Sequence, residues 1–335
     1  MDSGVVLVVV LALAFAFTNG IQDAANSIAT LVATRAAQPR GALVMATVVI
    51  LVSPFLVGSA VAETIAGIVD VGTDETAEVL ACGLAAALAW NVGAWLLGVP
   101  SSSSHALVGG LVGAAVAAAG LGSVRWGGFD GWRPEGVTAV LVALAVSPPL
   151  GAGAAFVALR AYRRALRRAT RRFAVPVRRA QWVTSALLSA GQGANDAQKA
   201  VGVISAVLVA SEASSGDPPT WTVAAAATAM AAGTALGGWR LVRTIGQRIY
   251  DLRALDALAS QTASAAVLLG ATAAGAPVSA THVVSSSVVG VGGARQRWGR
   301  VRWAVVRNIG VAWATTLPAT ALLAAGALTT WRWIT

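Results

Sequence analysis

The segment Gly191-Gln-Gly-Ala-Asn-Asp-Ala-Gln-Lys-Ala-Val-Gly202 places amide and charged side chains inside an apolar run that extends from Trp182 to Ala210. A charge at the centre of a membrane-spanning helix costs roughly 2.5–3.5 kcal/mol even on insertion-based scales. Asp196 and Lys199 together would therefore cost roughly 5–7 kcal/mol if both faced lipid. We expect them to face a protein interior or an aqueous cavity, which indicates a transport or relay site.

The composition predicts an all-α integral membrane protein. Hydrophobic residues make up 56% of the 335 positions and charged residues only 11%, whereas a soluble domain carries roughly 25% charged residues. Several apolar stretches approach or exceed the roughly 20 residues that a helix needs to cross a bilayer. They are continuous and lack strict alternation, which favours helices over a β-barrel.

Charge clusters between the apolar runs predict the topology. The formal net charge is +10, and arginine-rich loops are typical of the cytoplasmic side. We expect a multi-pass protein of the cell (plasma) membrane with its N-terminus outside and with basic cytoplasmic segments at 35–40, 160–179, 240–253 and 295–302. The basic segments indicate loops that contact lipid headgroups of the bilayer rather than nucleic acid. Continuous spans are expected at 42–68 and 223–239.

The first apolar run repeats the polar pattern of the opening segment. It contains Gln22, Asp23 and Asn26, and aligning Asp23 with Asp196 gives an offset of 196 − 23 = 173 residues. On the expected topology the two runs cross in opposite directions, which is the arrangement of inverted-repeat transporters. We expect a first inverted repeat at 1–159, a basic cytoplasmic linker at 160–181 and a second inverted repeat at 182–335.

A second pair of motifs lies at two expected turning points. Gly98-Val-Pro-Ser-Ser-Ser-Ser-His105 matches Gly275-Ala-Pro-Val-Ser-Ala-Thr-His282 at an offset of 277 − 100 = 177 residues. Proline ends one helix, and the next helix begins with free N–H groups that Ser and Thr can cap while presenting hydroxyl donors. We expect two re-entrant helical hairpins, at 79–121 and 255–293, whose tips could bind a tetrahedral oxyanion.

These motifs resemble the inorganic phosphate transporters, the PiT or solute carrier 20 family, over nearly the whole chain. The resemblance rests on Asn19–Thr30, Gly193–Lys199, Pro100–His105 and Pro277–His282, supported by Gly237–Gly246. It implies a symporter that takes up inorganic phosphate with sodium or protons by alternating access, and commonly a homodimer. The sequence departs from the family at Gln22 and Gln192, where relatives often have histidine, and at Ala280, where a hydroxyl is common.

The resemblance also implies two sets of site residues. The cation-binding residues are Asp23, Asn26, Asn195 and Asp196. The substrate-binding residues are Ser102, Ser103, Ser104, Gln198, Ser279 and Thr281. No cofactor and no metal beyond the coupling cation are expected, and His105 and His282 are interpreted as packing or capping residues because paired histidines without cysteine make a poor metal site.

Several alternatives stay open at this point. The two aspartates could be structural hydrogen-bond anchors, and Lys199 could either neutralise an aspartate or contact the substrate. A sulfate permease of the same fold would use the same tetrahedral site, and an anion channel would line a pore with the two repeats. An enzyme is not expected, since the sequence has no Gly-x-Ser-x-Gly elbow and no Walker A or dinucleotide fingerprint.

Overall fold

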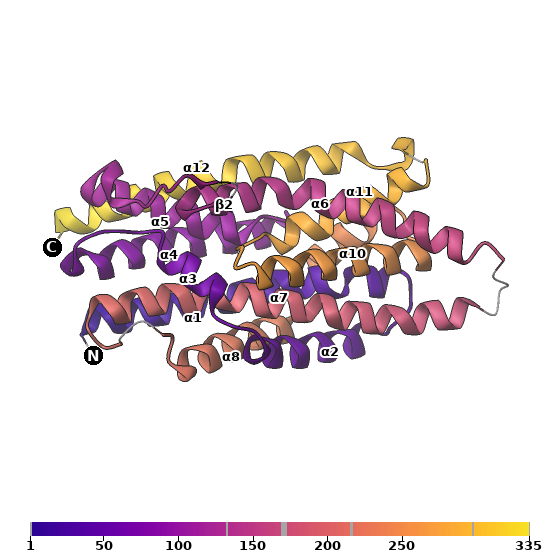
Figure 1. Cartoon of the computed structure of the whole chain (residues 1–335), viewed down its shortest axis with the longest axis horizontal. Helices are drawn as coiled ribbons and strands as arrows, with labels where there is room; N and C mark the ends of the chain where they lie inside the picture. Colours follow the sequence, from indigo (N-terminus) through magenta and orange to yellow (C-terminus); the bar gives the residue numbers. More distant parts are fainter. Residues whose placement is uncertain (1, 132, 169–172, 215–216, 297, 335) are drawn as a thin grey trace.

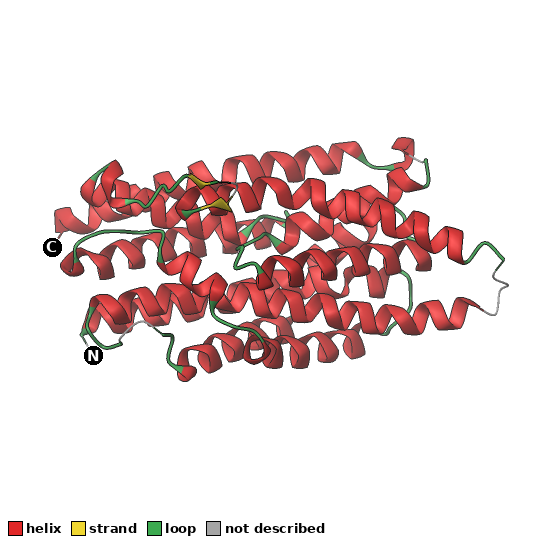
Figure 2. Ribbon diagram, viewed as in Figure 1, coloured by secondary structure: helices red, strands yellow, loops and turns green. Residues whose placement is uncertain are grey.

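A computed structural model describes residues 2–131, 133–168, 173–214, 217–296 and 298–334, and these ranges form one elongated helical bundle (Figures 1 and 2). A single short pair of strands, β1 (Phe129–Asp130) and β2 (Arg133–Pro134), lies in a connection within the described residues. Six described segments are long and apolar enough to cross a membrane. The all-α prediction is therefore confirmed.

The helices follow one another along the chain in two similar series. The first series is α1 (Ser3–Ala33), α2 (Pro39–Val52), α3 (Ala60–Ala66), α4 (Thr73–Leu97), α5 (Ser103–Ala119) and α6 (Gly136–Ala165). The second is α7 (Ala174–Ala210), α8 (Thr220–Leu236), α9 (Trp239–Arg243), α10 (Ala254–Ala273), α11 (Ala280–Ala294) and α12 (Trp303–Ile334). Short turns are η1 (Ser53–Leu56), η2 (Leu121–Ser123), the π-helical η4 (Thr244–Arg248) and η5 (Trp298–Arg300).

The second span of each series is broken, where the sequence predicted a continuous helix. The segment 42–68 divides into α2, η1 and α3, with Pro54 inside the turn and Gly58 just after it. The segment 223–239 breaks at Gly237, which has φ +68°, a conformation that glycine adopts without steric cost. The predicted basic loop at 240–253 is also wrong in part, since α9 and η4 continue as helix through Arg248.

The predicted linker at 160–181 is shorter than expected. Helix α6 continues through Ala165 and α7 begins at Ala174, so the arginines near both ends of this segment extend the helices. Residues 169–172 of the linker lie outside the described residues. The two-repeat division itself stays a prediction.

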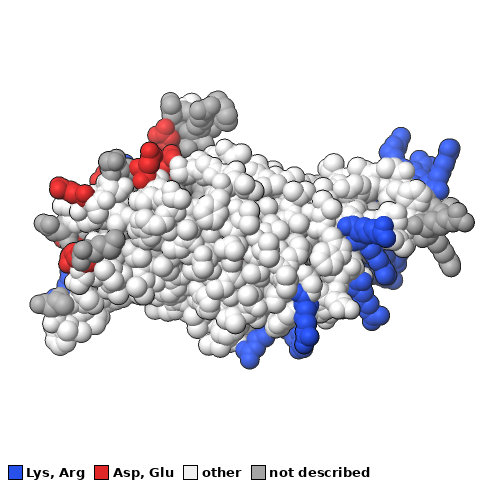
Figure 3. Space-filling view, turned by 90° about the horizontal axis from the view of Figure 1, so that it is seen from below, with Lys and Arg blue, Asp and Glu red and all other residues white. Residues whose placement is uncertain are grey.

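Most of the exposed charged side chains lie toward one or the other end of the bundle. On the face shown in Figure 3, most of the exposed arginine side chains lie toward one end and the Asp and Glu side chains lie at the other, with uncharged residues between them. Both chain termini lie at the acidic end (Figure 1). Two arginines there are paired with acids: Arg125 with Asp70 at 3.0 Å, and Arg332 with Glu75 at 3.0 Å and with Glu78.

The helix pairs α4–α5 and α10–α11 correspond to the two predicted hairpins. The second helix of each pair packs against the last helix of the other series, at glycines that the 177-residue offset matches. A Cβ added to Gly113 of α5 would lie 2.2 Å from the carbonyl oxygen of Ala321 in α12, and one added to Gly290 of α11 would lie 2.1 Å from the carbonyl oxygen of Ala152 in α6. These backbones touch because small residues let helices approach closely in a membrane. The two series are therefore interlocked rather than side by side.

The polar helices α1 and α7 likewise pack against a helix of the other series. A Cβ on Gly20 of α1 would lie 2.0 Å from the carbonyl oxygen of Met230 in α8, and one on Gly193 of α7 would lie 2.9 Å from Cα of Ile50 in α2. The 173-residue offset that aligns Asp23 with Asp196 also matches Gly20 with Gly193. The close contacts fix α1 and α7 along their length and so set where their polar residues lie.

Candidate functional site

Two polar helices and two hairpin tips meet in the interior of the bundle. From α1, the Asn26 Nδ2 donates to Asp23 Oδ1 and to Thr281 Oγ1, each at 3.1 Å. Thr281 is the second residue of α11, so this bond joins the first half to the tip of the second hairpin. The tips also touch each other, because Ser104 Oγ donates to the Val278 carbonyl oxygen at 3.1 Å. The sequence-predicted pieces therefore converge.

Lys199 lies at the centre of this cluster, and it is fully buried. Its Nζ donates to Ser104 Oγ at 2.6 Å and to the Val278 carbonyl oxygen at 2.9 Å, and it forms an ion pair with Asp196. The Asp23 and Asp196 side chains are also close enough to interact directly. In this conformation Lys199 neutralises an aspartate, which was one of its two open interpretations.

Four buried oxygen atoms at this place have no hydrogen-bond partner. They are Asp23 Oδ2, Asn26 Oδ1, Asn195 Oδ1 and Asp196 Oδ2. The amide nitrogens of both asparagines are used, Asn195 Nδ2 donating to Thr272 Oγ1 at 3.2 Å and to the Ala276 carbonyl at 3.0 Å. A buried acceptor without a partner costs about 1–3 kcal/mol. Hard cations take oxygen ligands of this kind, so the arrangement suits a cation.

Serine caps begin both hairpin helices, as the motif predicted. Ser102 Oγ accepts from the His105 backbone N–H at 3.2 Å and contacts His105 Nδ1 at 2.8 Å. Ser279 Oγ accepts from the His282 backbone N–H at 3.3 Å. The two histidine rings lie 4.7 Å apart, and the His282 ring lies 3.9 Å from that of Trp313 in α12. These tilted ring contacts join the two tips to α12.

The histidines have these packing and capping contacts, and the described residues contain no group of three or more His, Cys, Asp or Glu side chains that could hold a metal ion.

Comparison with known proteins identifies the family. A family model described as the phosphate transporter family matches residues 19–177 and 163–324. A probable low-affinity inorganic phosphate transporter of Bacillus subtilis is 40% identical, over 96% of this chain and 95% of that protein. The chain belongs to the phosphate transporter family. A protein of the same description from Rhizobium meliloti is 41% identical, over 95% of this chain and 93% of its own.

The fold is also that of a phosphate transporter of known structure. A solved structure titled "The sodium-dependent phosphate transporter" superposes with a TM-score of 0.88 over 100% of both chains, at 24% sequence identity. The resemblance drawn from the motifs is thus confirmed. The chain is a membrane transporter of this family and not an enzyme.

Gln198 lies apart from the cluster, although it was predicted as a substrate ligand of the phosphate transporter. Its Oε1 accepts from the backbone N–H groups of Val61 at 2.9 Å and Ala62 at 3.3 Å, and its Nε2 donates to the Gly58 carbonyl at 2.6 Å. Gln198 therefore ties the start of α3 to α7. It lines a pocket of about 210 Å³ beside the η1–α3 connection. Ser103, predicted in the same set, is half-buried.

Two residues beside Asp23 were not predicted as ligands. Gln192 Nε2 donates to Asp23 Oδ1 at 3.3 Å, and Ser27 Oγ donates to Gln192 Oε1. The sequence marked Gln192 only as a departure from the family pattern. Helical spacing could have found both, since residues four apart share a helix face: Ser27 follows Asp23 by four positions and Gln192 precedes Asp196 by four.

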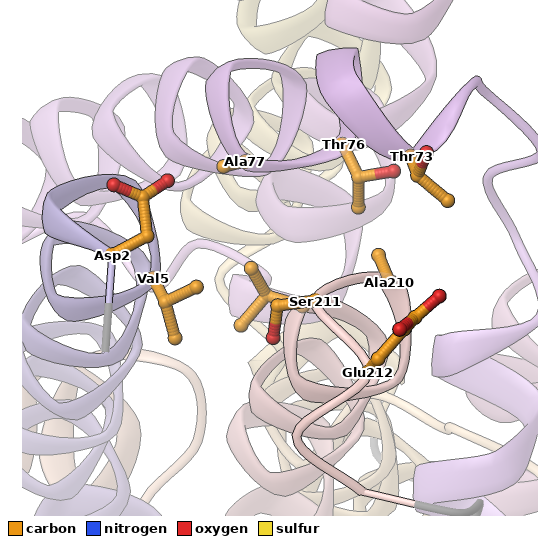
Figure 4. Close-up of a pocket in the computed structure, with 9 residues that line it drawn as sticks. Asp2, Val5, Thr73, Thr76, Ala77, Ala210, Ser211 and Glu212 are labelled. Atoms are coloured by element: carbon orange, nitrogen blue, oxygen red, sulfur yellow. The ribbon is translucent and has the colours of Figure 1, made fainter.

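A separate pocket opens at the acidic end of the transporter. It has a volume of about 370 Å³ and lies between the ends of α1, α4 and α7 (Figure 4). Asp2, Thr73, Thr76 and Glu212 are among the residues that surround it. The predicted cation and substrate residues are not among those that line it, so this pocket is distinct from the candidate site.

Proposed function

We propose that this chain takes up inorganic phosphate together with sodium or protons, by alternating access. The observation that carries the proposal is the convergence of unpartnered carboxylate and amide oxygens with two hydroxyl-bearing helix ends, drawn from both halves of the chain. A cation and a tetrahedral anion need these two kinds of ligand side by side. Each would lower the cost of bringing the other into the membrane interior.

The energetics favour coupling to cations. Moving one elementary charge across 100 mV is worth roughly 2.3 kcal/mol, so a divalent phosphate entering a negative interior faces roughly 4.6 kcal/mol. Two monovalent cations would cancel this cost. In the proposal, cations bind first, at Asp23 with Asn26 and at Asn195 with Asp196, and the anion then docks at the two tips.

The tips supply the hydroxyl donors that a tetrahedral anion needs. Ser104 and Thr281 already bond to Lys199 and Asn26, which contact the two aspartates. Ser102, Ser103 and Ser279 lie at the same helix N-termini, where free N–H groups favour an anion. In the proposal, Gln198 binds the anion only after the segment that begins α3 moves away, because its side chain is hydrogen-bonded to backbone groups of Gly58 and Val61 in this conformation.

The relatives support phosphate and sodium as the transported ions. Those from Bacillus subtilis and Rhizobium meliloti are named low-affinity inorganic phosphate transporters, and the solved structure is titled sodium-dependent. We further propose that the acidic end with both termini faces outward in the plasma membrane, following the positive-inside rule. Two copies are proposed to form a homodimer, as the family resemblance implies.

The test is uptake of labelled phosphate into proteoliposomes under an imposed sodium gradient or an imposed pH gradient. One of the two gradients should drive accumulation above equilibrium, and collapsing it should stop accumulation. Equal uptake without either gradient would mean an anion channel. Complete competition by an equal concentration of sulfate would mean a sulfate permease.

A further inference from the structure

Lys199 occupies in the second half the position that Asn26 occupies in the first. The offset of the polar helices places it there, since 26 + 173 = 199. Both residues bond the aspartate three positions earlier, Asn26 to Asp23 and Lys199 to Asp196. The two positions are therefore equivalent in contacts as well as in sequence.

Asn26 and Lys199 also share a second kind of contact. Asn26 bonds Thr281 Oγ1 at 3.1 Å and Lys199 bonds Ser104 Oγ at 2.6 Å, and Ser104 and Thr281 are matched by the hairpin offset, since 281 − 104 = 177. Each therefore reaches the hairpin tip of the opposite half. The difference is chemical: a neutral amide stands in one half and an ammonium in the other.

We propose that the Lys199 ammonium is a built-in cation that fills the second of the two equivalent cation positions. Its Nζ is held by a carboxylate oxygen, a hydroxyl oxygen and a carbonyl oxygen, of Asp196, Ser104 and Val278. Oxygen atoms of these types are what a monovalent metal cation would take. The consequence for transport rests on the proposed function, whereas the claim that the Lys199 ammonium fills a cation position can be tested without transport.

The charges of the cluster then set the stoichiometry. With both carboxylates ionised, Asp23 and Asp196 contribute two negative charges and Lys199 one positive charge, which leaves a net charge of −1 (−2 + 1). One mobile cation balances it, and the oxygens without partners, Asp23 Oδ2 and Asp196 Oδ2 among them, are its ligands. One cation carried with a monovalent phosphate is electroneutral, so Lys199 takes the place of one of the two mobile cations assigned above to the two aspartates, and the transporter moves one cation per phosphate.

The first experiment needs no transport. Purified wild type and Lys199→Asn are unfolded thermally in detergent across a series of sodium chloride concentrations, with choline chloride holding the ionic strength constant. A cation that binds only the folded state stabilises it by mass action. Lys199→Asn places at position 199 the amide that Asn26 provides in the first half. The midpoint temperature of unfolding of this variant should rise with sodium concentration about twice as steeply as that of wild type, because two cation sites replace one.

Two matched variants keep this test decisive. Lys199→Met fills similar space without an oxygen ligand and should not gain the extra sodium dependence. Asn26→Lys places an ammonium in the first position too, and should lose sodium dependence altogether. A Lys199→Asn protein with the sodium dependence of wild type, or an Asn26→Lys protein that keeps it, would overturn the proposal.

The second experiment measures coupling in proteoliposomes. The Hill coefficient for the coupling cation should rise from about 1 in wild type to about 2 in Lys199→Asn, the limit being the number of sites. Phosphate uptake by wild type should be insensitive to a potassium–valinomycin potential, and uptake by the variant should respond to it. An unchanged cation dependence with a raised KM for phosphate would show that Lys199 is an anion ligand instead.

The two claims can fail separately. If Lys199→Asn gains sodium-dependent stability while neither protein accumulates phosphate, the built-in cation stands and the proposed function falls. If phosphate uptake is driven by a cation gradient but both proteins show the same sodium dependence in stability and uptake, the proposed function stands and the built-in cation falls.

Discussion

Removing the charge of Asp196 tests how strongly the structure depends on the buried ion pair. Lys199 is fully buried, and Asp196 is 2% exposed. Breaking a buried pair by removing one partner costs about 3–5 kcal/mol because the other charge is left uncompensated. For Asp196→Asn we expect about 3 kcal/mol, the lower end, because Ser104 and Val278 still accept from the ammonium and the Asp23 carboxylate is nearby.

A double-mutant cycle separates the charge effect from packing. Replacing both charges, with Asp196→Asn and Lys199→Met, leaves no isolated charge, and such neutral replacements are often close to neutral in stability. The double variant should therefore be more stable than Asp196→Asn alone, with an interaction of about 2–3 kcal/mol. The exposed pair of Arg302 and Asp251, at 3.3 Å, is the control: Asp251→Asn should cost about 0.5 kcal/mol or less.

The assay is unfolding in mixed micelles with rising detergent denaturant, followed by tryptophan fluorescence from the 12 tryptophans. Phosphate uptake by Asp196→Asn should be abolished although the protein still inserts into membranes. If the unfolding free-energy costs of Asp196→Asn and Lys199→Met simply add in the double variant, the two side chains are not coupled and the structural argument is refuted. Normal uptake by Asp196→Asn would count against a transport role for this aspartate.

Three further substitutions test the helix packing, the helix cap and the predicted role of Gln198 as a substrate ligand. Gly290→Ala should cost about 1–3 kcal/mol because its Cβ would meet the Ala152 carbonyl at 2.1 Å, whereas Gly326→Ala, with nothing within 4 Å, should change thermal stability by about 0.5 kcal/mol or less. Ser102→Ala should lower the same unfolding free energy by about 1 kcal/mol through loss of the α5 cap, and Ser102→Thr should retain most of it. Gln198→Ala should lower stability while leaving the KM of phosphate uptake unchanged; a raised KM at intact stability would return Gln198 to the substrate set.

The convergence of the site was predictable from the sequence because burial of polar groups in a membrane is expensive. Asp23 and Asp196 had to face the interior. The similar offsets of the two motif pairs, 173 and 177 residues, indicated that each half of the chain carries one aspartate motif and one hairpin tip. The separate position of Gln198 could also have been expected, while its role as a substrate ligand stays a prediction. It lies two positions after Asp196, and residues two apart on a helix do not face the same way, whereas Lys199 at three positions does.

Other features depend on contacts that the sequence does not display. The arginines of 240–253 suggested a loop, yet α9 and η4 are helical there because their apolar residues, such as Leu241 and Ile245, are buried against the bundle. The tilted ring contact of His282 with Trp313 joins α11 to α12, and no spacing pattern in the sequence predicts it.

The interlocked packing has a consequence for how the protein is made. Helix α5 packs closely against α12, which is synthesised after the other described helices, with Gly109 and Gly113 set against Leu317 and Ala321. Until α12 is made, the side of α5 that carries Gly109 and Gly113 lacks this partner, although Gly110 already packs against Gly83 of α4. A nascent chain that stops short of α12 should therefore be held or degraded by membrane quality control, however complete its first half.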